Sequence, residues 1–195
     1  MARLKAIDAQ HFRIPLDVPA SDSTHGVMTS FELITARVTD ADGQQGVGYT
    51  YTTGHNGGAI HHLLAREIPE VVAAADCELI EAIWQKVWWA LHYGGRGGPA
   101  VLALSALDMA LWDLKAKRAN LPLYRLLGGN DPKVPCYAGG IDLDFTLDAL
   151  LRQTDDNLAK GFHAAGEASD LRSCRCALSE FIELKVHTAC LGDLA

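Results

Sequence analysis

Positive charge is scarce in this sequence. Only 17 of its 195 residues are Lys or Arg, against 24 that are Asp or Glu, which leaves a formal net charge of −7. Proteins that bind nucleic acid normally carry a basic stripe. The charge balance therefore argues against a nucleic-acid partner.

Long apolar runs are also absent. No uninterrupted stretch approaches the roughly 18 apolar residues of a membrane span, and Arg3, Lys5 and Asp8 stand where a signal peptide needs an apolar core. We therefore expect a soluble, cytoplasmic protein that has no membrane partner. The five cysteines are then expected to be reduced thiols rather than a disulfide framework.

Compact catalytic and ligand-binding motifs are missing as well. The glycine run at 94–98 follows one helical pattern and precedes another, and no Gly-Lys-Ser/Thr is present, which favours a flexible connector over a phosphate cradle. His61 and His62 are adjacent and point apart on a helix, while Cys174 and Cys176 have no second pair at zinc-finger spacing. Spacing alone therefore predicts no metal site and identifies no catalytic residue.

The sequence does contain a globular composition, 49% hydrophobic and 21% charged, and a clear period of two in its first third. Alternation over 2–14, 31–38 and 47–51 predicts three strands, and a turn is expected at 40–43. Two prolines are expected to end the first strand, and 17–29 is expected to be a polar loop. Strands in this order predict an antiparallel meander.

The period then changes from two to 3.6 residues. Apolar stripes predict one helix over 60–72, bent or broken at Pro69, and a second over 79–91, capped by Asp76. A third helix is expected to begin at Pro99, since proline suits the first helical turn. Strands followed by helices imply an α+β unit.

The pattern changes once more after residue 129. A short strand at 134–138, followed by a helix that ends at Gly161, predicts the opening of a βα repeat. The sequence shows no internal repeat of fixed period.

Two pairs of side chains one helical turn apart have structural interpretations. Trp84 and Trp88 share a face with core positions, which favours core packing over a stacking platform. Asp113 and Lys117 are expected to form a surface ion pair. Neither pair predicts a functional site.

Two polar segments are candidates for a binding site. Residues 17–29 and 51–58 each lie at a strand end and carry groups able to hold a small polar ligand, among them His25, Tyr51 and His55. Ordinary solvent-exposed loops are the alternative interpretation, and composition alone favours that alternative.

The third helical pattern carries a specific motif. It runs Ala-Leu-Ser-Ala-Leu-Asp-Met-Ala-Leu-Trp-Asp-Leu-Lys-Ala-Lys over 103–117, and Pro-Leu-Tyr-Arg-Leu-Leu-Gly follows at 122–128. This pattern resembles the signature of the mandelate racemase/muconate lactonizing enzyme family, within the enolase superfamily, and the resemblance extends from residue 1 to about 162. It implies an α+β fold, with an enolase-like N-terminal capping domain over 1–129 and the first strand and helix of an incomplete (β/α) barrel over 130–162.

The resemblance implies Mg²⁺-dependent removal of the α-proton of a carboxylate, as in racemases and acid-sugar dehydratases. The substrate would be a small-molecule carboxylate or acid sugar, and full-length relatives are expected to be homo-oligomers. In the family, two loops of the cap close over the barrel mouth, and the two polar segments match them in position. His25 would then donate to a substrate hydroxyl or carboxylate, Tyr51 would wall the pocket and His55 would close over it.

The family pattern stops after Phe162. Relatives carry a Lys-x-Lys pair in the second barrel strand, whereas Gly166 and Ala168 stand at the matching positions here and cannot take a proton. A complete barrel also needs about 250 residues. We interpret 163–195 as a tail outside the family pattern, from out-of-frame translation or an altered gene-model end. The alternative function is therefore a catalytically inactive fragment or an interaction module, with no catalytic residue, metal ligand or cofactor expected in the chain alone.

Overall fold

The computed structural model describes residues 2–133, 136, 138–140, 143–162 and 165–167. The chain divides into two compact units. The first holds Met1–Pro15 and Ser30–Pro132, and the second holds Leu16–Thr29 and Lys133–Ala195. The proposed tail at 163–195 lies outside the described residues, apart from 165–167.

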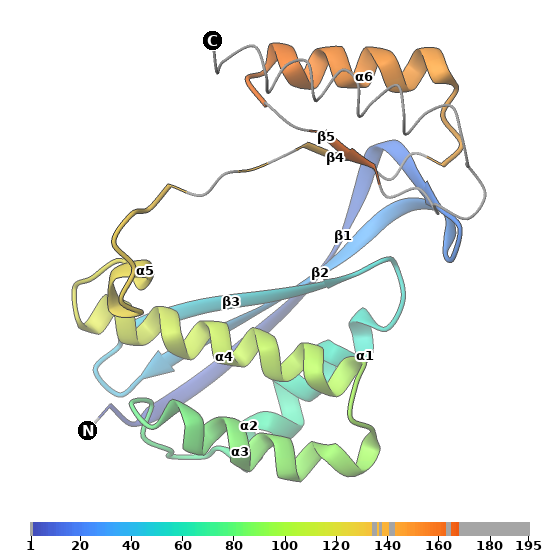
Figure 1. Cartoon of the computed structure of the whole chain (residues 1–195). Helices are drawn as coiled ribbons and strands as arrows, with labels where there is room; N and C mark the ends of the chain where they lie inside the picture. Colours follow the sequence, from blue (N-terminus) through green and yellow to red (C-terminus); the bar gives the residue numbers. More distant parts are fainter. Residues whose placement is uncertain (1, 134–135, 137, 141–142, 163–164, 168–195) are drawn as a thin grey trace. The chain divides into compact units, whose positions relative to one another are not determined.

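A three-stranded antiparallel sheet forms one layer of the first unit (Figure 1), although the end of its first strand and the start of its second belong to the second unit. Its strands, in spatial order, are β1 (Leu4–Asp22), β2 (Gly26–Asp40) and β3 (Gln45–Thr52). In the register of β2 with β3, Leu33 lies opposite Tyr51 and Arg37 lies opposite Val47. The predicted meander and the α+β class are confirmed.

The first two strands are longer than the sequence pattern predicted. β1 runs past Pro15 and Pro19 to Asp22, and β2 begins at Gly26, so the polar loop expected at 17–29 is wrong in extent. β1 is an edge strand, and an edge strand tolerates proline because half of its N–H groups face away from the sheet and need no partner.

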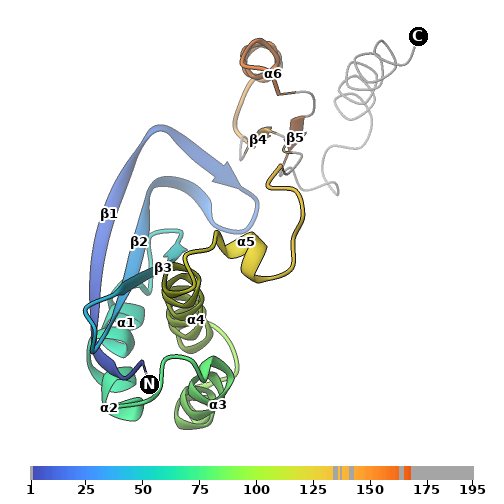
Figure 2. The same cartoon turned by 90° about the vertical axis from the view of Figure 1, so that its left-hand side faces the viewer.

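Helices form the other layer of the first unit. They are α1 (Gly57–His62), a π-helical turn η1 (Leu63–Glu67), α2 (Ile68–Val71), α3 (Ile80–Leu91), a 3₁₀ turn η2 (His92–Gly94), α4 (Pro99–Arg118) and α5 (Leu123–Leu126). Figures 1 and 2 show α4 running along β3, with α3 packed against α4. Among the described residues, no helix combines the length and the apolar character needed to cross a membrane.

The predicted helical stripes account for much of the core. Ile60, Leu64, Ile68 and Val72, spaced four apart, are completely buried. The α-helical pattern is interrupted at η1, before Pro69 rather than at it, and α2 continues past the proline to Val71. Pro99 opens α4, as predicted.

Two predictions about the second helix need correction. Asp76 does not cap it, because α3 begins at Ile80 and the Asp76 carboxylate instead accepts a hydrogen bond from the Glu78 N–H at 3.1 Å. Trp84 is 39% exposed and stacks on the half-buried Trp88 with ring centroids 5.5 Å apart. The indoles therefore pack on each other at the edge of the core, because Ile83 and Val87 fill its centre.

β3 and α4 approach so closely that side chains are excluded between them. A Cβ placed on Gly46 would lie 2.0 Å from the Ala110 carbonyl oxygen, and one on Gly48 would lie 2.1 Å from that of Ala106. Ala106 and Ala110 are themselves completely buried. The two glycines therefore serve helix–strand packing.

An acidic side chain closes the far end of the β2–β3 hairpin. Asp40 is completely buried, and its Oδ1 accepts hydrogen bonds from the N–H groups of Asp42 (3.0 Å) and Gln44 (2.9 Å). Its Oδ2 pairs with Arg118, which also reaches Asp42 and, at 3.3 Å, Glu78. Asp40 thus ties the turn to the C-terminal end of α4.

The same flank of α4 carries the predicted surface ion pair. The Lys117 ammonium lies 2.7 Å from Asp113, which confirms that expectation. Asp113 also accepts a hydrogen bond from the Val47 N–H at 2.8 Å, so it fastens β3 to the helix.

The second unit contains a strand–helix–strand segment. β4 (Ala138–Gly140) and β5 (Ala165–Glu167) pair in parallel, with Gly139 opposite Gly166, and α6 (Leu147–Ala159) connects them. This is the expected opening of a βα repeat, although residues 134, 135 and 137 of the predicted strand lie outside the described residues. Ala168, the second position compared with the family's lysines, also lies outside them.

Candidate functional site

The segment between β3 and α1 is anchored by a buried carboxylate. Glu32 of β2 has a side chain only 12% exposed. Its Oε2 accepts hydrogen bonds from the Thr52 hydroxyl (2.8 Å) and the Gly57 N–H (2.9 Å), and its Oε1 accepts one from His11 Nε2 (3.1 Å). One side chain thereby fixes both ends of residues 53–56.

Close packing around Glu32 explains the glycine at position 57. A Cβ there would lie 2.5 Å from His11 Nε2 and 2.7 Å from Glu32 Oε2, so a larger residue would displace the network. His11 also stacks on His61, with ring centroids 6.3 Å apart, and the His61 Nε2 lies 3.2 Å from the Ala9 carbonyl oxygen. The anchor therefore joins β1, β2 and α1.

The pKa of Glu32 lies below its ordinary value of 4.5, because hydrogen bonds from Thr52, Gly57 and His11 outweigh the opposing effect of burial. A carboxylate with a lowered folded-state pKa stabilises the fold above its unfolded-state pKa, and that contribution is lost as pH falls through the folded-state value. We expect wild-type stability to fall more steeply than that of Glu32→Gln between about pH 6 and about pH 3. Urea unfolding across this range measures the difference.

Glu70→Gln serves as the control for that experiment, since Glu70 is exposed and has no partner among the described residues. Its stability should follow the wild-type pH curve. Parallel curves for wild type and Glu32→Gln would contradict the stabilising role assigned to the ionised carboxylate.

His55 lies between two anchor points of the same segment. Gly54 and Asn56 on either side adopt left-handed backbone conformations, with φ of 101° and 71°. The guanidinium of Arg13 donates to the Gly54 carbonyl at 3.5 Å and to the Ser30 hydroxyl at 3.1 Å. His55 itself is exposed. Its imidazole therefore faces solvent, while hydrogen bonds to the neighbouring residues fix the position of its backbone.

Tyr51 lies near the end of β3, as the sequence pattern predicted. It is 60% exposed on β3, on the alternate row from Gly48 and Thr50 that face the helices. Its ring packs edge-on against Phe31, with centroids 6.1 Å apart. Tyr51 therefore lies on the face of β3 opposite the one that packs on α4.

His25 lies in the second unit, in the turn between β1 and β2. Asp22 accepts hydrogen bonds from the N–H groups of Thr24 and His25 and, at 2.8 Å, from His25 Nδ1. These bonds, led by the His25 N–H, lower the pKa of Asp22. Because an ionised carboxylate can only accept, Nδ1 carries the hydrogen, and the half-exposed ring presents Nε2 to solvent.

The anchoring residues were not identified from the sequence, although a signal was present. Glu32 stands on the same row of β2 as Ile34, Ala36 and Val38, which face the core. An acidic residue on a buried row requires partners. His11 and Thr52, which supply them, lie 21 and 20 residues away in the sequence.

Among the residues that the structure describes, no group of three or more His, Cys, Asp or Glu side chains could hold a metal ion. The described residues therefore do not provide a Mg²⁺ site.

A family model matches most of the first unit. Residues 7–128 match the mandelate racemase / muconate lactonizing enzyme N-terminal domain. That segment includes every residue of the Glu32 anchor and all three candidate residues.

Two characterised bacterial enzymes are similar in sequence. The 3,6-anhydro-alpha-L-galactonate cycloisomerase of Streptomyces coelicolor is 54% identical over 153 residues, which cover 78% of this chain and 42% of the relative. The L-talarate/galactarate dehydratase of Salmonella typhimurium is 39% identical over 146 residues, covering 71% of this chain and 36% of the relative. The chain thus spans less than half the length of these relatives.

Solved structures show the same fold. A racemase from Streptomyces coelicolor with bound magnesium superposes with a TM-score of 0.84 at 45% identity, covering 98% of this chain and 52% of the other. The Salmonella typhimurium dehydratase, liganded with Mg and L-lyxarohydroxamate, superposes with a TM-score of 0.81 at 32% identity, covering 96% and 49%.

Proposed function

This chain belongs to the mandelate racemase/muconate lactonizing enzyme family, and from that premise we propose that it supplies the substrate-selecting cap of an enzyme that removes the α-proton of an acid-sugar carboxylate. The similar enzymes are an acid-sugar cycloisomerase and acid-sugar dehydratases, which supports the substrate class. The α-proton of a carboxylate is very weakly acidic, and Mg²⁺ bound in such enzymes neutralises the charge that develops on the oxygens. The described residues offer no site for that ion, so their part in the proposal is recognition.

The observation that carries the proposal is the support given to two exposed histidines at strand ends. Asp22 fixes the tautomer of His25, so the neutral ring accepts a hydrogen bond from a sugar hydroxyl at Nε2, and the protonated ring donates to a carboxylate. The Arg13 and Glu32 contacts fix the backbone on both sides of His55. Groups positioned in this way lose little conformational entropy on binding a polar ligand.

A transfer experiment tests the cap. Residues 1–128 replace the matching segment of the Streptomyces coelicolor cycloisomerase, and deuterium incorporation at the 2-position of a panel of acid sugars is followed by NMR in D₂O with Mg²⁺. We expect the hybrid to catalyse deuterium exchange at the 2-position of its preferred substrate. His25→Ala or His55→Ala should lower kcat/KM by about tenfold, the effect of losing one hydrogen bond to a charged group. A folded, active hybrid that is indifferent to both substitutions would refute the assignment.

A second assay tests whether the chain is a catalyst by itself. The full chain alone is incubated with Mg²⁺ and the same panel of acid sugars. We expect no exchange, because the described residues contain no metal-ligand group. Exchange by the chain alone would show that it carries its own base and metal site, and the cap would then not be its whole role.

A further inference from the structure

A groove between α3 and α4 has no part in the proposed function. It is a cavity of about 420 Å³, lined by Ile80, Glu81, Trp84, Gln85, Asp108 and Trp112. Pockets of this size are typical of small-molecule sites. All six residues lie in the first unit, so the groove is complete within one compact body.

The residues that line this groove include two carboxylates, Glu81 and Asp108, and no basic side chain. Neither the Glu81 nor the Asp108 side chain forms an ion pair or hydrogen bond with another described residue. Asp108 is half-buried, and burial raises its pKa. A partly desolvated carboxylate without a partner gains most from an incoming cation, because the cation restores the interactions that were lost with water.

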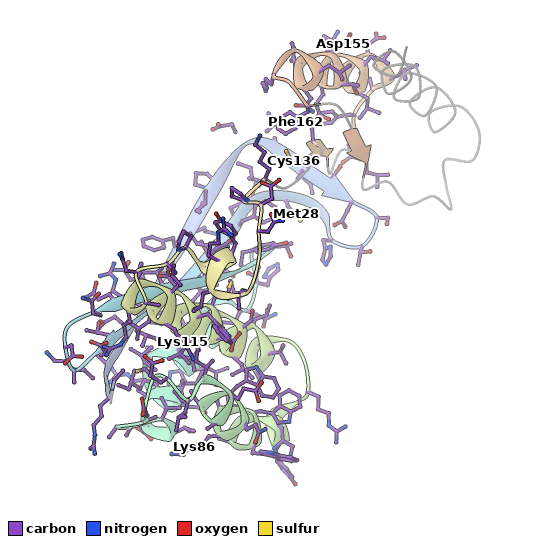
Figure 3. The ribbon with its side chains drawn as sticks, turned by 60° about the vertical axis from the view of Figure 1, so that its left-hand side comes forward. Met28, Lys86, Lys115, Cys136, Asp155 and Phe162 are labelled. Atoms are coloured by element: carbon purple, nitrogen blue, oxygen red, sulfur yellow. The ribbon has the colours of Figure 1, made fainter. Side chains whose placement is uncertain are left out.

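The nearest lysine on the helix is already engaged. Lys115 lies 3.7 Å from the Glu78 carboxylate and 3.4 Å from the Glu78 carbonyl oxygen, and it sits over the Trp112 ring at 5.5 Å. Lys86, on α3, is exposed to solvent (Figure 3). The Trp112 contact also shows that an indole of this groove accepts a cation on one of its faces.

Two indoles, those of Trp84 and Trp112, line the groove. Trp84 is held by stacking on Trp88, with an interplanar angle of 11°. A planar guanidinium can stack on an indole and donate two parallel hydrogen bonds to a carboxylate, which a compact ammonium cannot do. Gln85 adds an amide at the same groove.

We propose that the α3–α4 groove binds a guanidinium group between Trp84 and Trp112, with Asp108 and Glu81 as its acceptors. The guanidinium belongs to a free small molecule or to an arginine side chain of a polypeptide, and the chemistry of recognition is the same for both. This site is independent of the histidines assigned to acid-sugar recognition.

Tryptophan fluorescence tests the proposal directly, because the four tryptophans of the chain all lie on α3 and α4. Methylguanidinium is titrated at low millimolar concentration into the full chain in low salt, and N-methylurea, its uncharged analogue, is the ligand control. We expect a saturable change with methylguanidinium and none with N-methylurea. Equal responses to both, or no saturable response, would overturn the site.

Variants locate the site. Asp108→Asn and Trp84→Leu should each weaken methylguanidinium binding by at least about tenfold, whereas Asp8→Asn, which removes one exposed acidic charge from β1, should leave it unchanged. Circular dichroism verifies folding, and Glu81→Gln replaces any variant that fails to fold. Unchanged affinity in the folded groove variants would contradict the proposal.

A third ligand, the peptide acetyl-Gly-Arg-Gly-amide, distinguishes the two sources of the guanidinium group when its affinity is compared with that of methylguanidinium. Binding tighter than that of methylguanidinium assigns the site to an arginine side chain of a polypeptide. Weaker binding assigns it to a free small molecule. In either case, the loss of affinity in Asp108→Asn must appear with both ligands.

Discussion

Replacing Gly48 by alanine is expected to destabilise the protein severely. The new methyl group would lie 2.1 Å from the Ala106 carbonyl oxygen and 2.7 Å from the Ala110 nitrogen. Both are backbone atoms in the middle of α4, so no side-chain rotation can relieve the clash. Because β3 and α4 must separate, we expect a loss of at least about 3 kcal/mol in the free energy of unfolding. Thermal unfolding followed by circular dichroism should show a fall in Tm of about 6–12 °C or more.

Gly58→Ala is the matched control for Gly48→Ala. Nothing lies within 4 Å of a Cβ built on Gly58, and this residue is in the exposed first turn of α1. Alanine is a better helix former than glycine by about 0.5–1 kcal/mol, so this variant should be as stable as wild type or slightly more stable. Similar Tm values for the two alanine variants would show that β3 and α4 are not packed as closely as described.

Asp40→Ala is expected to produce the second largest effect. The substitution leaves the turn N–H groups of Asp42 and Gln44 without their acceptor and takes one carboxylate from Arg118. Loss of a fully buried acceptor with three donors should cost about 3 kcal/mol in unfolding free energy. Chemical denaturation at neutral pH measures this quantity.

Asp42→Ala separates burial from charge in that comparison. Asp42 contacts the same guanidinium at 3.0 Å, yet its side chain is 67% exposed. Exposed ion pairs contribute at most about 1 kcal/mol, so this variant should remain close to wild type. If both aspartate variants lost equal stability, the importance of the buried hydrogen bonds of Asp40 would be disproved.

Local periodicity predicted the elements of this fold better than it predicted their ends or their contacts. The three strands, the stripe from Ile60 to Val72 and the opening of α4 at Pro99 all follow from the spacing of apolar residues and proline. The extent of β1 was not predictable in this way, because proline ends a central strand and is tolerated in an edge strand. Which strand lies at the edge is a property of the whole sheet.

The candidate site shows the same limit. His25 and His55 could be proposed as candidates from the sequence because they lie in short polar segments at strand ends. Their supports depend partly on long-range contacts, since Glu32 meets Gly57 across 25 residues and Arg13 meets Gly54 across 41. Only the acidic residue on the buried row of β2 indicated that such contacts exist.

The close packing of β3 on α4 also constrains the register in which β3 pairs with β2. Side chains alternate between the two faces of a strand, so shifting β3 by one residue exchanges the faces. Deleting a single residue from the turn that precedes β3 would therefore turn Val47 and Tyr49 toward α4, where the present glycines leave room only for hydrogen. A register slip of one residue therefore cannot be accommodated while β3 stays packed on α4.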